Sequence, residues 1–143
     1  MIRPVNSAKR PYLRWKTSAA CNAGQIAVVS GGLALPAAEN CSAATVLGVF
    51  VEDAASGAIS YIYPGNQEFE FSIYQGDTTD VAALANQGVA YDIYVDGAAG
   101  DAGAEGETYL DLNDTSTGFV VLSNYDNTRR VATGSFLQAQ LYV

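Results

Sequence analysis

The stretch Glu68-Phe-Glu-Phe-Ser-Ile-Tyr74 decides the fold class, because apolar and polar side chains alternate strictly along it. Successive side chains of a strand point to opposite faces, so the two phenylalanines and Ile73 share one face, while the two glutamates and Ser72 share the other. Alternation of this kind is typical of a half-buried strand in an antiparallel sheet. The stretch therefore predicts a sheet with one face on a core.

Segments of strand composition lie on both sides of this stretch, separated by turns rich in Gly, Pro, Asn and Asp. They comprise residues 25–30, 33–35, 45–52, 58–63, 89–95, 109–112, 119–123 and 136–143, the last running to the C-terminus. About nine short strands at this spacing predict an all-β fold, a small β-barrel or β-sandwich of antiparallel strands. Within the segment 89–95, we expect Asp92 to point outward.

One segment, residues 77–87, has a helical pattern instead. Thr78 or Thr79 is a suitable N-cap, Val81 and Leu84 have helical spacing, and Gly88 stands where a C-terminal glycine belongs. We therefore expect one short helix of one to two turns.

The charges divide the chain into an arm, residues 1–20, and a body, residues 21–143. The net charge is −8, but five of the seven basic residues lie within the first sixteen positions, which hold no acid. All fifteen acids lie between Glu39 and Asp126. The chain is thus an acidic body with a cationic arm.

Pro4 and Pro11 exclude a continuous helix in the arm, which is expected to be extended. Its cations are interleaved with aromatic side chains, and Trp, Tyr and Arg supply much of the energy of protein–protein interfaces. The predicted partner-binding residues are Arg3, Lys9, Arg10, Tyr12, Arg14, Trp15 and Lys16.

Ordering sixteen residues costs about 15–30 kcal/mol, and a small body offers little groove to offset that cost. We therefore expect a neighbouring chain to order the arm, by strand addition or groove binding. Two alternatives stay open: an arm folded on its own body, and a disordered solubilising tail.

Other partners and locations are disfavoured. The acidic body would repel nucleic acid, and no nucleic-acid-binding motif is present. No run approaches the roughly 18 apolar residues of a membrane span, and no signal peptide is recognisable, so synthesis in a cytoplasm is expected. In that compartment Cys21 and Cys41 are expected to be free thiols, although a disulfide formed after release from a cell is also compatible with the sequence.

The sequence offers little chemistry, and we expect neither an enzyme nor a cofactor. It contains no histidine, and the nucleophile-elbow, phosphate-loop and dinucleotide motifs are absent. Paired acids such as Glu68 with Glu70, or Asp92 with Asp96, are expected to be solvated rather than catalytic. The spacing of the acidic loop 96–107 fits neither the EF-hand nor the calcium-binding nonapeptide repeat, so a solvated loop is expected there rather than a calcium site. Most of the nine tyrosines are expected in the core or in cross-strand pairs.

The order of turns and strands resembles the head decoration, or cement, proteins of tailed bacteriophages. The resemblance spans roughly residues 20–122. It is carried by Ala23-Gly-Gln25 leading into residues 26–32, by residues 46–52, Phe69-Glu-Phe71, Gly76-Asp77, residues 84–92 and Tyr109-Leu-Asp-Leu-Asn-Asp-Thr-Ser-Thr-Gly118. The resemblance implies a β-barrel-like body on the outer surface of a phage head, bound to the major capsid protein, often as a trimer or another small oligomer. It supplies no catalytic residues, and the arm lies outside it.

We therefore expect a virion structural protein that binds the assembled capsid and stabilises it, with the arm contacting neighbouring subunits. The alternative is a carbohydrate- or receptor-binding module of a phage tail or surface structure.

Overall fold

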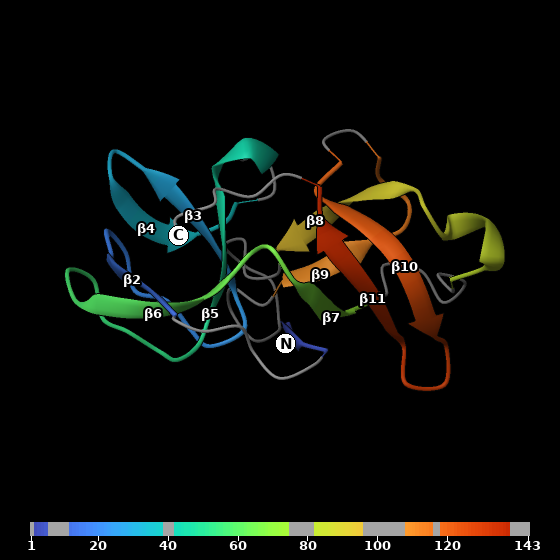
Figure 1. Ribbon diagram of the computed structural model, residues 1–143, viewed down its shortest axis with the longest axis horizontal. Helices are drawn as coiled ribbons and strands as arrows, with labels where there is room; N and C mark the ends of the chain where they lie inside the picture. Colours follow the sequence, from blue (N-terminus) through green and yellow to red (C-terminus); the bar gives the residue numbers. More distant parts are fainter. Residues whose placement is uncertain are drawn as a thin grey trace, which may run out of the picture.

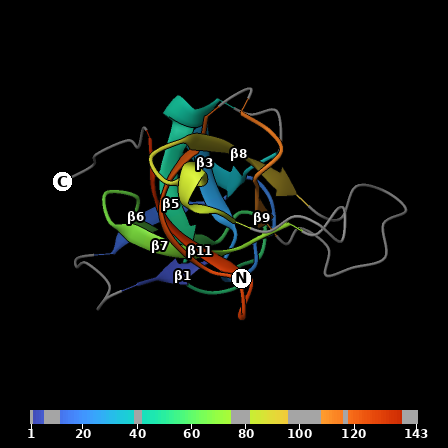
Figure 2. The same cartoon turned by 90° about the vertical axis from the view of Figure 1, so that its right-hand side faces the viewer.

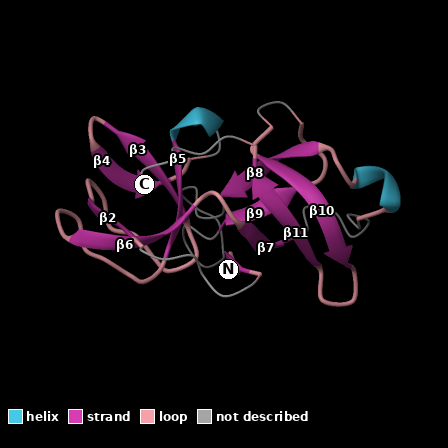
Figure 3. Ribbon diagram, viewed as in Figure 1, coloured by secondary structure: helices cyan, strands magenta, loops and turns pink. Residues whose placement is uncertain are grey.

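The computed structural model describes residues 2–5, 12–38, 42–74, 82–95, 108–115 and 118–137. The described chain is mostly strand and forms two antiparallel sheets, with two short 3₁₀ turns, η1 (Ala43–Thr45) and η2 (Leu84–Asn86) (Figures 1 and 3). The all-β prediction is confirmed, in its sandwich rather than its closed-barrel form.

Each sheet joins strands that are distant in the sequence. The six-stranded sheet has the order β1 (Arg3–Pro4), β7 (Glu68–Ser72), β11 (Val131–Phe136), β10 (Val120–Asp126), β8 (Ala90–Val95) and β9 (Thr108–Asp111). The five-stranded sheet has the order β2 (Leu13–Lys16), β6 (Ile59–Pro64), β5 (Val46–Phe50), β3 (Ile26–Ser30) and β4 (Leu33–Pro36).

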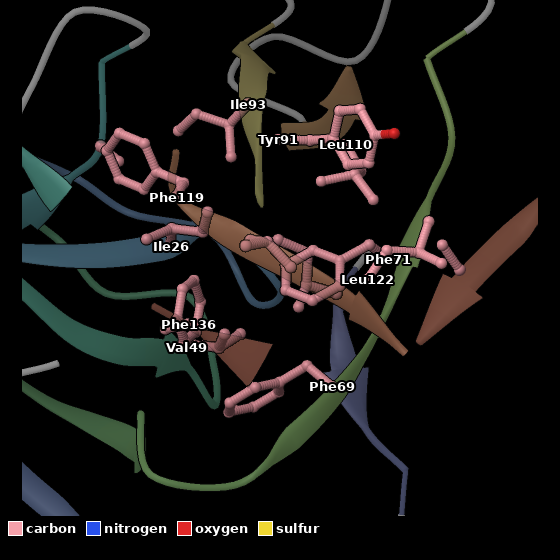
Figure 4. Close-up of a cluster of buried hydrophobic side chains, with 14 of the residues drawn as sticks. Ile26, Val49, Phe69, Phe71, Tyr91, Ile93, Leu110, Phe119, Leu122 and Phe136 are labelled. Atoms are coloured by element: carbon pink, nitrogen blue, oxygen red, sulfur yellow. The ribbon is translucent and has the colours of Figure 1, made fainter. Parts of the chain in front are cut away.

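The larger core lies between the two sheets. The alternation in β7 is realised as predicted, since Phe69 and Phe71 are fully buried and Glu68 is exposed. The two rings meet Phe136 of β11 at centroid distances of 5.5 and 5.7 Å. The same cluster includes Ile26 of the five-stranded sheet (Figure 4). One apolar cluster thus joins both sheets.

Strands β3 and β5 are buried on both faces, because a second, smaller cluster covers the other side of the five-stranded sheet. In β5, Val46 and Val49 belong to the larger cluster, whereas Leu47 and Phe50 belong to the smaller one. The three-residue spacing within each pair breaks the usual period of two. The strand therefore changes register, and a β-bulge lies where β5 pairs with β3.

Gly48 makes this bulge possible. A Cβ at this position would overlap the backbone carbonyl oxygen of Tyr63 and lie 2.9 Å from the carbonyl carbon. The N–H of Gly65 donates to the carbonyl oxygen of Leu47 at 2.9 Å, which holds β6 close to the bulge. The backbones approach too closely for any residue with a side chain.

Both sheets curl, so that strands far apart in the strand order approach each other. In the five-stranded sheet, Thr17 and Ala34 form an isolated bridge between the ends of β2 and β4. In the six-stranded sheet, Ile73 and Leu110 form the corresponding bridge, and the N–H of Tyr74 donates to the Leu110 carbonyl at 2.9 Å. A single bridge does not make a closed barrel, but it covers part of an edge that would otherwise attract other strands.

Three predictions of local structure need correction or fall partly outside the described residues. The last strand of the described chain is β11, which ends at Phe136 where the predicted strand 136–143 begins; most of that predicted strand, residues 138–143, lies outside the described residues. The predicted helix 77–87 appears only as the 3₁₀ turn η2, since residues 75–81 lie outside the described chain. Gly88 does follow this turn, with φ +81°.

The third correction concerns Asp92, which is buried, at 4% exposure, rather than pointing into solvent. Its backbone N–H donates to the carbonyl of Asp114 at 2.8 Å. Its carboxylate accepts from the N–H of Ile93 at 2.8 Å. The segment after β9 therefore lies beside β8 at Asp92, a neighbour that periodicity within one strand does not reveal.

We predict that Gly48→Ala lowers the free energy of unfolding by about 3 kcal/mol or more, because the new methyl group collides with the Tyr63 backbone rather than with a movable side chain. Urea unfolding measures the loss. Gly57→Ala is the matched control: Gly57 also has a positive φ, +82°, but nothing lies within 4 Å of its Cβ position. Its loss should be only about 1–2 kcal/mol, and equal losses would contradict the role assigned to Gly48.

Candidate docking surface

The arm enters both sheets of its own chain. Strand β1 pairs with β7, with Arg3 opposite Glu70, and strand β2 pairs with β6, with Arg14 opposite Tyr61. Ile2 is buried at 2% exposure. In the single chain these residues are ordered on their own body, which is one of the alternatives that the sequence left open, because the body supplies two sheet edges, a slot for Ile2 and a carboxylate for Arg3. Residues 6–11, including Lys9 and Arg10, lie outside the described chain.

The two faces of β2 have different roles. Leu13 and Trp15 are half-buried and pack on the smaller cluster, beneath the sheet. The hydroxyl of Ser60 donates to the carbonyl oxygen of Trp15 at 2.9 Å. Trp15, predicted as a partner-binding residue, therefore lies on the core side, and Arg14 and Lys16 are the exposed side chains of this strand.

The outer side of this strand pair forms a surface that we call the β2–β6 face. It consists of Tyr12, Arg14 and Lys16 from the arm and of Ile59, Tyr61 and Tyr63 from β6.

Contacts across the strands organise this face. The guanidinium carbon of Arg14 lies 5.8 Å from the centroid of the Tyr61 ring, within the range of a cation–π interaction. The Tyr12 ring meets Tyr63 edge-to-face, with centroids 5.4 Å apart and an interplanar angle of 89°. Lys16 lies opposite Ile59. Each of the two cations of β2 thus lies opposite an aromatic or aliphatic side chain of β6.

The outer part of the β2–β6 face is open to solvent. Ile59 is 49% exposed and Tyr61 is 37% exposed, while Tyr63 is half-buried and packs on the larger core. Among the described residues, no carboxylate forms an ion pair with Arg14 or Lys16, although the chain has a net charge of −8. The face therefore presents two cations and two apolar side chains without acidic neighbours bonded to them.

Arg3 has a different role from Arg14, because it is bound to the body through Glu70. Its Nε and Nη2 donate to Glu70 Oε1 at 3.0 and 2.7 Å. Arg129 approaches the same carboxylate, with Nη2 2.9 Å from Oε1 and Nη1 3.3 Å from Oε2. We call this trio the Glu70 clamp. It joins β1, β7 and the turn between β10 and β11.

Burial by itself would raise the pKa of Glu70, but hydrogen bonds and charge attraction from both arginines outweigh it and hold this pKa below its ordinary value of 4.5. A general acid of a glycosidase needs the opposite shift, a raised pKa. The clamp thus fits an anchoring role for Glu70 rather than proton donation.

The attachment of β1 combines several small contributions. Burying Ile2 contributes about 2–3 kcal/mol, and the exposed ion pair with Glu70 about 0.5–1 kcal/mol. The pairing of β1 with β7 is flanked by backbone hydrogen bonds from Ile2 to Gly24 and from Val5 to Glu68. Losing the charged partner of Arg3 therefore removes only part of the attachment.

A second group of aromatic side chains lies in the six-stranded sheet, at the pair of strands β8 and β9. Tyr74 stacks on Tyr94 with centroids 3.7 Å apart, and Tyr109 lies 6.2 Å from Tyr74. These half-buried rings contact one another across strands, as predicted for most tyrosines.

The acidic loop 96–107 lies outside the described residues, and the described part of the chain contains no cluster of acids or cysteines suited to a metal ion.

Cys21 carries a free thiol at 3% exposure, whereas Cys41 lies outside the described chain. Burial raises the pKa of Cys21, and the nearby carboxylates of Asp53 and Glu52 add to this effect, which a backbone hydrogen bond from Ala54 offsets only in part. Its thiolate is thus disfavoured.

Within the described residues, no helix has the length and apolarity that a membrane crossing requires.

Five residues that complete these sites were not predicted from the sequence: Ile59, Tyr61 and Tyr63 of the β2–β6 face, and Glu70 and Arg129 of the clamp. Alternation in the segment 58–63 was a usable signal for the first three, since it places them on one side of the strand. No local signal connects Arg129 with Glu70, because β7 and β11 pair across about sixty residues.

Comparison with models of known protein families, and with characterised proteins, finds no match to this chain.

We predict that Glu70→Gln lowers the free energy of unfolding at pH 7 by about 0.5–1 kcal/mol, since both arginines lose their charged partner. Because the folded-state pKa of Glu70 is lowered, its stabilisation is present above about pH 4.5 and is lost as the pH falls through the folded value. Urea unfolding should thus show a smaller difference between wild type and variant at pH 3 than at pH 7. Glu68→Gln, an exposed neighbour, is the control and should change little; a similar loss from both variants would contradict the clamp.

Proposed function

We propose that the protein is a structural component of a phage particle that binds the outer surface of the capsid through its β2–β6 face and stabilises the shell. The observation that carries the docking role is the pair of exposed cations, Arg14 and Lys16, which have no acidic partner among the described residues and flank the exposed Tyr61 and Ile59.

This arrangement favours an acidic protein partner. Desolvating an aromatic ring and an aliphatic side chain supplies affinity, and neighbouring cations attract carboxylates and set the orientation. The rest of the chain is strongly acidic, so an acidic partner would approach this face and be repelled elsewhere. The face also lies on regular strands, which hold its side chains in place better than loops do.

The capsid as the setting is supported by the resemblance of residues 20–122 to head decoration proteins. The partner would then be the major capsid protein, and the protein would assemble as a small oligomer, a trimer by preference, over a symmetry axis. The residues of the arm divide the work: Tyr12, Arg14 and Lys16 face the partner, while Arg3 and Trp15 fasten the arm to the body.

The alternative is a carbohydrate- or receptor-binding module. A sugar would need a free ring face on which to stack, and among the described aromatic residues Tyr61 is the most exposed. Arg14 already lies over that ring, which favours protein docking. Strong signals on a glycan array that disappear in Tyr61→Ser, together with no capsid binding, would favour the alternative.

We predict that Arg14→Gln combined with Lys16→Gln weakens binding to assembled capsids of the same phage at least tenfold, because two charge-assisted contacts are lost. Co-sedimentation of purified protein with capsids measures the affinity. Ser30→Glu combined with Gln87→Glu is the control, because it changes the net charge by the same amount at exposed positions outside the face. Equal weakening by both double variants would mean that only the net charge affects binding, and would contradict docking through the β2–β6 face.

A further inference from the structure

The edge of β7 that holds β1 is a small binding site for an extended peptide. Its contacts are the pairing of β1 with β7, the buried slot of Ile2 and the Arg3–Glu70 ion pair. Two backbone hydrogen bonds flank the pairing, from Ile2 to the Gly24 carbonyl at 3.3 Å and from Val5 to the Glu68 carbonyl at 3.1 Å. We call this site the β1 seat. Figure 2 shows β1 at the outer edge of the sheet, beside β7.

The occupant of the seat is held by few contacts. Strand β1 is two residues long, lies at the edge of the sheet and pairs with β7 alone. Its charged anchor is exposed to solvent, with 60% of the Arg3 side chain accessible. Because β1 is a two-residue edge strand, its release would uncover Ile2 and one edge of β7 but would leave the pairing of the other strands in place.

Every copy of the chain carries both the segment and the seat. Residues 2–5 of a second copy reproduce each of these contacts, so exchange changes no contact energy within the seat. Charge favours the encounter, because the first sixteen residues hold five cations and no acid, whereas all fifteen acids of the chain lie beyond them. The arm of one copy is therefore attracted to the body of another, while the two bodies repel each other.

We propose that the β1 seat is a strand-exchange site, in which residues 2–5 of one copy occupy the seat of a second copy and so link neighbouring subunits. The Glu70 clamp selects the strand. Arg129 holds the carboxylate beside the seat, and the arriving Arg3 completes the trio. An N-terminal segment with a cation at this position and an apolar side chain before it satisfies both the slot and the carboxylate.

This inference does not depend on the proposed capsid docking, since exchange takes place between copies of this chain and is measured without a capsid. Its failure would leave the β2–β6 face as a docking surface, and failure of capsid binding would leave exchange intact.

Cysteine cross-linking tests the exchange. Val5 and Glu68 are both exposed and are joined by a backbone hydrogen bond across the seat, so cysteines at these positions lie within reach of a disulfide. Both substitutions leave the Arg3–Glu70 ion pair in place. One purified chain carries Val5→Cys and a size tag, the other carries Glu68→Cys, and both carry Cys41→Ser. After the chains are mixed and mildly oxidised, non-reducing electrophoresis and intact mass quantify the mixed disulfide dimer.

The expected result is a mixed dimer at least tenfold more abundant than in a control mixture of Val5→Cys with Ser30→Cys, whose cysteine is exposed on the other sheet. Adding Glu70→Gln to the Glu68→Cys chain should lower the yield severalfold. A yield equal to that of the control mixture would overturn strand exchange, and a yield unaffected by Glu70→Gln would overturn the selecting role of the clamp. Circular dichroism of each variant verifies that the body is folded.

Discussion

The whole structure depends on the burial of one pair of strands, β3 and β5, from both sides. Each sheet alone would expose an apolar face, but β3 and β5 send side chains alternately into the larger and the smaller cluster. The bulge at Gly48 lets β5 serve both, because it resets the alternation so that Val46 and Val49 face one cluster while Leu47 and Phe50 face the other. The two apolar clusters thereby share the strands β3 and β5, and a chain of 143 residues can support two sheets.

The division of the arm follows from this arrangement. The body has an open edge in each sheet, at β7 and at β6, and the arm supplies one short strand to each. In β2, strand periodicity places Trp15 on the inside and Arg14 and Lys16 on the outside, so that one tetrapeptide both closes the smaller core and exposes a cationic surface. In β1 the outward cation meets Glu70 instead. Identical residue types therefore have opposite roles because their strands join different edges.

Periodicity predicted most of the fold. The segments 25–30, 58–63 and 68–74 have strand patterns that survive in the structure nearly unchanged, because their alternation reflects burial by a partner sheet whatever that sheet is. It failed at two places. Asp92 is buried although its position in the alternation predicts exposure. The strand β11, from Val131 to Phe136, was not predicted because small residues such as Ala132 and Gly134 form its alternation. Composition distinguishes the arm from the body, but it does not reveal which strands of the body pair with the arm, because those strands lie dozens of residues away in the sequence.

The segregation of charge gives these features a common explanation. A protein that is acidic throughout repels its own copies and every acidic partner, which favours solubility but opposes assembly. Here the cations are concentrated in a segment that is partly bound by Glu70 and partly displayed beside Tyr61. Under the proposed docking and exchange, attraction is confined to the β1 seat and the β2–β6 face, and the acidic remainder of the surface opposes contacts with other acidic surfaces. Both sites use strands of the same arm, β1 and β2, so the proposed subunit linkage and the proposed partner docking would draw on one segment of the chain.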